Sequence, residues 1–162
     1  MPQALDAIDL RLLTLLQADA ARSNQDLAAA AQVSPATALR RVRALVDAGV
    51  IERQVAIVAP ARVGGLSAIA EVTLDRQGAE HIAVFEARAV ADPAVQQCYR
   101  VSPGPDLVLM LWLADMAAYH LLVQRLFTQD ANVRNVKSYF VTHRAKFAPA
   151  VDMAALAPAV KA

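Results

Sequence analysis

Residues 23–51 decide the fold of the first part of this chain and read SNQDLAAAAQVSPATALRRVRALVDAGVI. Ser23, followed three residues later by Asp26, is a residue type that caps the N-terminus of a helix. Ser34 stands directly before Pro35, and proline is favoured in the first turn of a helix because an N–H there has no partner to lose. Gly49 then supplies the left-handed backbone that often ends a helix. Two capped helices joined by a short turn are typical of a helix-turn-helix.

A further helix is predicted before this motif and a strand after it. Asp6 and Asp9 have the spacing of a capping box, and apolar residues recur at helical intervals after them. After Gly49, the run at residues 50–58 is rich in Val and Ile, which favours a strand that is either the wing of a winged helix-turn-helix or the segment that leads out of it. We therefore assign residues 1–58 to a winged helix-turn-helix domain that binds DNA.

The helix that begins at Pro35 has the polar face that DNA recognition requires. At about 100° per residue, four apolar side chains share one face: Leu39, Val42, Leu45 and Val46. Arg40 lies nearly opposite them, and Arg41 and Arg43 flank it. An arginine can hydrogen-bond to a guanine edge or to a phosphate. A merely solvated surface is the alternative, but the capped helix before these arginines and the strand after them favour DNA contact.

The front of the same helix is small, since Ala36 and Thr37 lie on the side of Arg40 and allow a close approach to the base edges. The N-termini of both helices also offer free N–H groups to phosphates. The residues expected to contact DNA are Ser23, Asn24, Ser34, Pro35, Ala36, Thr37, Arg40, Arg41 and Arg43.

Composition bounds the class of protein. The chain has 162 residues, of which 57% are apolar and 5% aromatic, so its cores must be built from Ala, Val, Leu and Ile. Cys98 is the only cysteine, which excludes an intramolecular disulfide and fits a reducing cytoplasm. We find neither a signal peptide nor the roughly 20 apolar residues of a membrane span. The net charge is +1, so any signal for DNA lies in the placement of charges and not in their sum.

The rest of the chain follows a β-α-β-β-α-β order, the ferredoxin-like plan. The predicted strands are residues 66–75, 95–102, 107–114 and 133–144, and the predicted helices begin at Gly78 and Asp115. Pro60 and Gly64–Gly65 mark a linker at residues 59–65. The fold class is therefore α+β, with a ferredoxin-like domain at residues 66–147 that serves dimerisation and effector binding. An Ala- and Pro-rich tail at 148–162 is expected to be weakly ordered.

The strand at residues 107–113, LVLMLWL, is apolar at every position, as if both of its faces were buried. Both helices of the ferredoxin-like plan cover the same face of the sheet. The other face therefore needs a partner, and the simplest partner is the same face of a second copy. A homodimer also presents two recognition helices to two half-sites of DNA.

Taken together, these pieces resemble the Lrp/AsnC family of transcriptional regulators. The resemblance covers residues 5 to about 147 and rests on Leu5-Asp6-x-x-Asp9, Arg22-Ser23, Ser34-Pro35, Arg40-Arg41-Val42, Leu45, Gly49-Val50-Ile51, Val101-Ser102, Asp106, Asp115-Met116, Tyr119 and residues 136–141. It implies a winged helix-turn-helix followed by a ferredoxin-like domain of the RAM type. It further implies binding to promoter DNA, homodimers that assemble into octamers, and an amino-acid effector held in clefts between dimers.

Carried onto this chain, the resemblance places the effector against the loop between the second and third strands of the ferredoxin-like domain. The implied residues are Ser102, Pro103, Gly104, Asp106, Met116, Tyr139, Phe140 and Val141. Asp106 can pair with an α-ammonium group, or it can simply cap a turn. Pro103 stands where the family usually has glycine, which removes an N–H donor and points to a different effector or to none. Gln32 also replaces a usual glycine, and a left-handed backbone there costs about 1–2 kcal/mol.

Two other functions stay open at this point. A tetrapyrrole enzyme similar to the siroheme decarboxylases would share both domains, and an architectural DNA binder would lack an effector. The three histidines, His81, His120 and His143, lie in different predicted elements without metal-ligand spacing. We therefore expect a regulator that is not an enzyme, has no cofactor and binds no metal.

Overall fold

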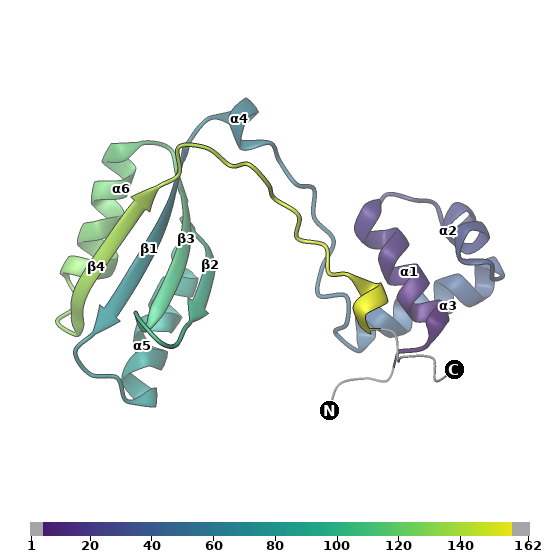
Figure 1. Ribbon diagram of the computed structural model, residues 1–162, viewed down its shortest axis with the longest axis horizontal. Helices are drawn as coiled ribbons and strands as arrows, with labels where there is room; N and C mark the ends of the chain where they lie inside the picture. The colour runs from purple at the N-terminus through teal and green to yellow at the C-terminus, as the bar shows by residue number, and fades with distance from the viewer. Residues whose placement is uncertain (1–4, 157–162) are drawn as a thin grey trace. The chain divides into compact units, whose positions relative to one another are not determined.

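The structure of the chain is a computed structural model that describes residues 5–156, apart from the side chain of Ala61. The described residues divide into two compact units, the first comprising residues 5–57 and 146–156 and the second residues 58–145 (Figure 1). No helix among the described residues is long and apolar enough to cross a membrane.

Three helices make up most of the first unit: α1 (Ala7–Ala18), α2 (Asn24–Ala31) and α3 (Pro35–Asp47). The predicted caps are confirmed. Asp6 accepts hydrogen bonds from the N–H groups of Ile8 and Asp9 at the start of α1, and the Asp9 carboxylate accepts one from the Asp6 N–H. Ser23 caps α2 and Ser34 caps α3, with Pro35 in the first turn.

Left-handed backbone occurs where it was predicted. Gln32 ends α2 with φ 59° and ψ 46°, and Gly49 follows α3 with φ 71°. For Gln32 this conformation costs about 1–2 kcal/mol relative to glycine. The sharp turn that it makes brings Val33 N–H to 3.0 Å from the Ala28 carbonyl oxygen and leads directly into α3.

The buried face of α3 differs from the predicted one. Leu39 and Val46 are 42% and 49% exposed, whereas Ala38 and Leu45 are buried. The core of this unit also contains Leu12, Leu27, Ala28 and Ala31. Small alanines let the helices pack closely, so the contact is centred on Ala38 and not on the larger Leu39.

The strand predicted at residues 50–58, as a wing or as the way out of the domain, is not formed. Residues 52–59 have no regular secondary structure, and Val55, Ile57 and Val58 are exposed. After α3 the chain folds back instead, with the N–H groups of Val50 and Ile51 both donating to the Leu45 carbonyl. A strand needs a neighbour to take up its backbone hydrogen bonds. No strand of the described chain pairs with this segment.

The second unit confirms the ferredoxin-like prediction. After the short helix α4 (Pro60–Val63), its elements are β1 (Leu66–Leu74), α5 (Ala79–Ala91), β2 (Val95–Arg100), β3 (Leu107–Leu113), α6 (Met116–Leu122) with its π-helical continuation η1 (Val123–Thr128), and β4 (Val133–Phe140). The four strands are antiparallel in the order β2-β3-β1-β4. The last strand ends four residues earlier than the predicted boundary at Arg144.

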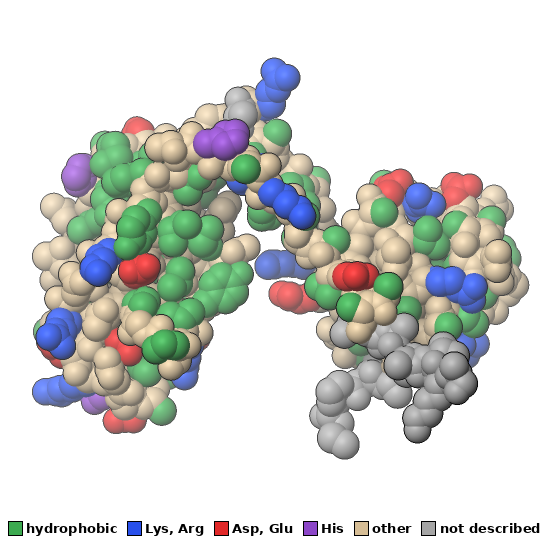
Figure 2. Space-filling view, viewed as in Figure 1, with side chains coloured by type: hydrophobic (Ala, Val, Ile, Leu, Met, Phe, Trp, Pro, Cys, Tyr) green, Lys and Arg blue, Asp and Glu red, His purple; other side chains and the backbone are tan. Residues whose placement is uncertain are grey.

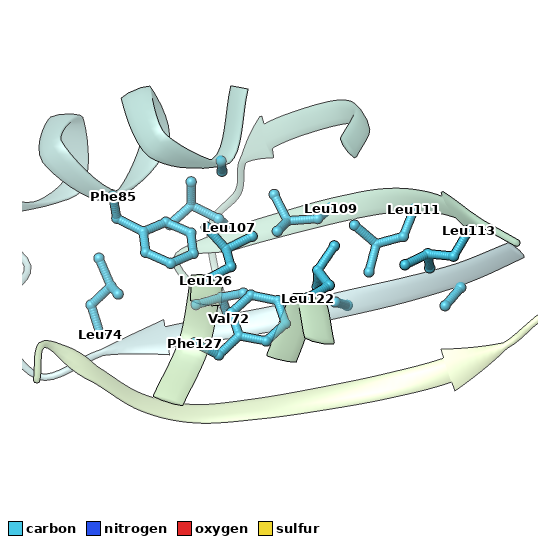
Figure 3. Packing of buried hydrophobic residues seen from close by; sticks show 13 residues of the cluster. Val72, Leu74, Phe85, Leu107, Leu109, Leu111, Leu113, Leu122, Leu126 and Phe127 are labelled. Atoms are coloured by element: carbon cyan, nitrogen blue, oxygen red, sulfur yellow. The ribbon is translucent and has the colours of Figure 1, made fainter. Parts of the chain in front are cut away.

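One face of this sheet carries the core, because α5 and α6 both cover it (Figure 1). Every second residue of β1 and β3 is buried there. Figure 3 shows the leucines of β3 in one cluster with Phe85 of α5 and Phe127 of η1. The ring centroids of these two phenylalanines lie 6.4 Å apart. The cluster includes Ala68, Ala70, Val72, Leu74, Phe85, Ala89, Leu107, Leu109, Leu111, Leu113, Leu122, Leu126 and Phe127.

The opposite face of the sheet is not covered by any element of this unit. The strand pairing sets Ile69 beside Met110 and Ser67 beside Trp112, and all four side chains are only half-buried. Figure 2 shows hydrophobic side chains gathered over the strands, with few charged groups among them. We call this surface, formed by the alternate residues Ile69, Glu71, Val108, Met110, Trp112 and Tyr139, the open face.

The described part of the tail, up to residue 156, belongs to the first unit, and hydrogen bonds hold part of it. The side-chain amide of Gln17 in α1 forms two hydrogen bonds with the backbone of Val151, accepting from its N–H at 2.7 Å and donating to its carbonyl at 3.0 Å. The 3-10 helix η2 (Met153–Leu156) then packs against α1. The segment expected to be weakly ordered, residues 148–162, therefore begins with an anchored stretch, and residues 157–162 lie outside the described part.

Candidate nucleic-acid interface and effector region

The surface of α3 is polar on the side turned away from the core. Ala36, Arg40 and Arg43 are all exposed, and their spacing of four and three residues places them on one stripe of the helix. Arg40 and Arg43 are therefore free to meet a ligand along this stripe. Since Ala36 has only a methyl group, the helix can approach a flat or grooved partner closely at its N-terminal end.

The N-termini of α2 and α3 are held together by the polar residues that the sequence singled out. The side-chain amide of Asn24 donates to the Pro35 carbonyl at 2.9 Å, which bridges the starts of the two helices. Ser23 Oγ accepts from the Asp26 N–H at 3.1 Å, and Ser34 Oγ accepts from the Thr37 N–H at 3.2 Å. These side chains thus fix the helix ends, whose unpaired N–H groups and positive dipole ends favour phosphate.

Arg41 is the exception among the three arginines. Its Nη1 lies 2.7 Å from Asp6 Oδ2 and 2.9 Å from Asp9 Oδ1, and its side chain is only 25% exposed. The hydrogen bond from the Asp9 backbone, and then the one from Arg41, hold the pKa of Asp6 below its usual value. The prediction set all three arginines on the DNA side, but Arg41 follows buried Ala38 by three residues and precedes buried Leu45 by four, which turns it toward α1.

Asp6 and Asp9 were predicted as caps but not as partners of the helix that carries the arginines. Each capping carboxylate needs only one oxygen for its own helix, so a second oxygen was available for a cation. The sequence contains that signal, but it does not indicate which of the basic residues comes within reach.

The loop between β2 and β3 holds four of the residues predicted to bind an effector. Ser102, Pro103 and Gly104 are exposed, the Ser102–Pro103 bond is cis, and Gly104 has φ 122°. Asp106 is instead engaged with the protein. Its Oδ2 accepts from the Leu74 N–H at 2.7 Å and from Gln77 Nε2 at 3.3 Å.

The other four predicted effector residues lie at the opposite end of the sheet. Met116 begins α6, while Tyr139, Phe140 and Val141 lie at the end of β4. Because β1 runs antiparallel to β3 and β4, Leu66 stands beside Leu113 at this end and Val72 stands beside Leu107 at the loop end. The nine residues of β1 span about 30 Å at roughly 3.3 Å per residue. Within a single chain, one small molecule therefore cannot reach both groups.

Aromatic side chains surround the Met116 end. Phe140 meets the ring of Tyr119 edge-on with centroids 5.0 Å apart, and the Tyr119 hydroxyl donates to Ser138 Oγ at 2.7 Å. On the open face, the Tyr139 hydroxyl donates to Glu71 Oε2 at 3.4 Å. Glu71 was not singled out from the sequence, although its alternate position in β1 among residues facing away from the core was a usable signal.

Two family models match the chain. A winged helix-turn-helix DNA-binding model matches residues 5–52, and the Lrp/AsnC ligand binding domain matches residues 67–151. The first match contains α1, α2 and α3, and the second contains nearly all of the four-stranded sheet and both of its helices.

Individual relatives match over nearly the full chain. An HTH-type transcriptional regulator of Haemophilus influenzae is 36% identical over 145 residues, which cover 89% of this chain and 86% of the relative. The Bkd operon transcriptional regulator of Pseudomonas aeruginosa is 34% identical over 137 residues, covering 84% and 90% of the two chains. Among solved structures, a transcriptional regulator of Neisseria meningitidis in complex with L-methionine has a TM-score of 0.84 and 27% identity, covering 94% of this chain and 99% of its own.

These relatives are regulators and not enzymes, so the decarboxylase alternative is not favoured. The structure agrees with the family matches in both units. The first unit carries an exposed arginine stripe on α3, and the second has a four-stranded sheet with helices on one face. The chain belongs to the Lrp/AsnC family of DNA-binding transcriptional regulators.

Proposed function

We propose that this protein binds promoter DNA as a homodimer through α3, with Arg40 and Arg43 as its main DNA contacts. The observation that carries the proposal is the exposed stripe of Ala36, Arg40 and Arg43 on the helix that follows the capped turn. A small residue beside two arginines suits the major groove, where an arginine can read guanine through two hydrogen bonds. A cytoplasmic location is part of this proposal, because the protein must reach DNA.

The remaining predicted contact residues act at the helix ends. Ser23, Ser34 and Thr37 use their side chains in caps, and Asn24 bridges to Pro35. Their part in binding is therefore to aim the N–H groups of α2 and α3 at the phosphates on either side of the groove. Backbone contacts of this kind position the protein, and the arginines of the stripe supply the sequence preference.

The open face of the second unit is the proposed dimer surface. It carries Ile69, Met110 and Trp112 without a covering element, and the sheet pairs Glu71 with Lys137 at its middle. Half-buried apolar side chains on a sheet gain most when a second sheet covers them. A twofold arrangement lets the same face serve both copies and supplies two recognition helices. Assembly of such dimers into an octamer is a further part of the proposal.

The proposed effector is an amino acid or a related metabolite, held between copies of the chain. A neighbour of similar structure was solved with L-methionine, which supports this class of ligand. Because the β2–β3 loop and Met116 lie at opposite ends of one sheet, a site built from both groups requires loops and strand ends from different copies. The exposed loop backbone at Ser102 and Gly104 suits a carboxylate, and Met116 and Phe140 suit an apolar side chain.

The test is binding of the purified protein to genomic fragments, followed by fluorescence anisotropy on the best fragment with wild type, Arg40→Ala and Arg11→Ala. Arg11 is exposed on α1 and serves as the matched control. One arginine–guanine pair is worth about 1–3 kcal/mol. Two half-sites then predict a loss of roughly 30-fold or more for Arg40→Ala and little change for Arg11→Ala. An Arg40→Ala protein that protects the same DNA as the wild type would contradict the assignment.

The same protein tests the effector and the assembly. A panel of amino acids in a thermal-shift assay should contain at least one that raises the melting temperature, because a ligand of the folded state stabilises it. If none does, the architectural binder without an effector becomes the better description. Light scattering with and without the ligand measures whether dimers assemble further, and a monomer at micromolar concentration would contradict the proposed dimer.

A further inference from the structure

The capping box of α1 is shared between two helices. Asp6 Oδ1 accepts from the N–H groups of Ile8 and Asp9 at 2.8 and 2.9 Å, while its Oδ2 lies 2.7 Å from Arg41 Nη1. Asp9 divides its oxygens in the same way: Oδ2 accepts from the Asp6 N–H at 3.2 Å, and Oδ1 lies 2.9 Å from Arg41 Nη1. Each carboxylate therefore holds the first turn of α1 with one oxygen and the middle of α3 with the other.

The contact is partly shielded from solvent. The Asp9 side chain is only 14% exposed, and Arg41 Nε is buried without a hydrogen-bond partner in the described chain. The contact also raises the pKa of Arg41, chiefly through its hydrogen bonds to Asp9 and Asp6. Charge-assisted hydrogen bonds are shorter and stronger than neutral ones. One guanidinium nitrogen thus ties together the start of α1 and the centre of the recognition helix.

We infer that Arg41 is a positioning residue for DNA recognition, which sets the rotation of α3 about its own axis and does not itself bind DNA. This inference rests on the proposed DNA-binding role of α3. Arg41 follows Arg40 directly, so the two point about 100° apart around the helix. With Arg41 held against Asp6 and Asp9, Arg40 must face away from α1.

The geometry indicates how much this restraint matters. Side chains reach about 5–6 Å from the axis of a helix. A rotation of α3 by roughly 20° would therefore move the tip of Arg40 by about 2 Å, which is enough to break a hydrogen bond whose donor and acceptor must lie within 2.7–3.2 Å. The packing of buried Ala38 and Leu45 limits such a rotation, and the two ion pairs of Arg41 add a directional restraint to it.

The competing interpretation is that Arg41 leaves the two acids and binds a phosphate when DNA arrives. The two interpretations predict opposite effects of Asp9→Asn. Asparagine keeps an acceptor for the Asp6 N–H but lacks the charge that holds Arg41. If Arg41 positions α3, this change weakens DNA binding. If Arg41 is a DNA ligand, the change releases it and binding becomes equal or tighter.

The experiment is anisotropy titration of the best promoter fragment at four salt concentrations with wild type, Asp9→Asn, Arg41→Ala and Asp47→Asn. Asp47 is an exposed acid on α3 and controls for the loss of one negative charge. We expect Asp9→Asn to weaken binding about threefold to tenfold. Arg41→Ala should weaken it at least as much. The slope of log K against log salt should be unchanged in both, because no phosphate contact is lost. Asp47→Asn should bind as tightly as the wild type or more tightly.

Two results with the variants would overturn the inference alone. The first is that Asp9→Asn binds DNA as tightly as the wild type or more tightly. The second is that Arg41→Ala makes the slope of log K against log salt shallower by about 0.9 for each arginine removed. Should Arg41→Ala fail to fold, Asp9→Asn decides the matter, since it keeps Arg41 and its pair with Asp6. If the wild-type protein binds no DNA under any condition, the proposed function fails and this inference fails with it. That outcome differs from one in which the wild type binds DNA and only the Asp9 variant departs from the expected result.

Discussion

Replacing Asp106 by alanine should destabilise the second unit, because its carboxylate closes the end of β1. The last residue of β1 that pairs with β3 is Val72, which stands opposite Leu107. Leu74 lies two residues farther along, so its N–H has no partner on β3. Asp106 precedes Leu107 directly and accepts this N–H at 2.7 Å. The carboxylate thus extends the hydrogen bonding of the sheet beyond the point where β3 begins.

The size of the effect follows from that contact. A hydrogen bond to a charged group contributes about 1.5–3 kcal/mol, whereas the second bond, from Gln77 at 3.3 Å in an exposed position, adds little. Asp106→Ala should therefore lower the free energy of unfolding by about 1.5–3 kcal/mol. For a unit of this size, 1 kcal/mol moves the melting temperature by about 4–8 °C, so the transition should fall by about 6 °C or more. Asp106→Asn keeps an acceptor for Leu74 and should lose less than about 1 kcal/mol.

Differential scanning calorimetry of the three proteins without any ligand measures this directly. The reasoning would be refuted if Asp106→Ala melted at the wild-type temperature. If that variant also lost the thermal shift produced by an amino acid, Asp106 would be an effector contact, as the family resemblance implied, and its place at the end of β1 would be incidental.

Two further predictions concern the fold. Gly65→Ala places a Cβ 2.7 Å from Trp112 Cζ2, so it should lower the unfolding midpoint and change the fluorescence emission of this single tryptophan. Gly64→Ala is the control, because its Cβ meets nothing within 4 Å and should leave the emission unchanged. The same emission spectrum from both variants would contradict the contact. The pKa of Asp92 is held below its usual value, first by the hydrogen bond from Arg125. The ionised carboxylate of Asp92 therefore stabilises the fold above a pH of about 3.9, and this contribution is lost as the pH falls through the lower pKa of the folded state. Urea denaturation should therefore show wild-type stability falling between about pH 5 and pH 2 more steeply than that of Asp92→Asn, and parallel curves would show that the ion pair does not contribute.

Local chemistry made much of this fold predictable. The caps at Asp6, Ser23 and Ser34 depend on hydrogen bonds that span two or three residues, so the sequence alone determines them. The left-handed Gln32 and Gly49 follow from the same short-range logic. The continuous apolarity of residues 107–113 predicted that both faces of β3 are covered, because a strand shows its two faces at every second residue. Because the ferredoxin-like plan puts both helices on one face, this run also predicted that the other face needs a partner.

Tertiary structure decided the features that depend on distant partners. The rotation of α3 depends on its contacts with α1 and α2: Ala38 is buried in place of Leu39, and Arg41 meets Asp6 and Asp9 from more than thirty residues away. Residues 50–58 have strand-forming side chains, but a strand forms only when another strand takes up its hydrogen bonds.

The effector region shows the same division. The sequence indicated Asp106 and Met116 as polar and apolar candidates, but antiparallel pairing of β1 with β3 sends them to opposite ends of the sheet. The tail is a further example of a contact that only the folded chain decides, since the hydrogen bonds between Gln17 and Val151 join residues 134 positions apart. Interactions between neighbours along the chain can be read from spacing, whereas those between distant residues depend on the packing of whole helices and strands, which only the folded chain defines.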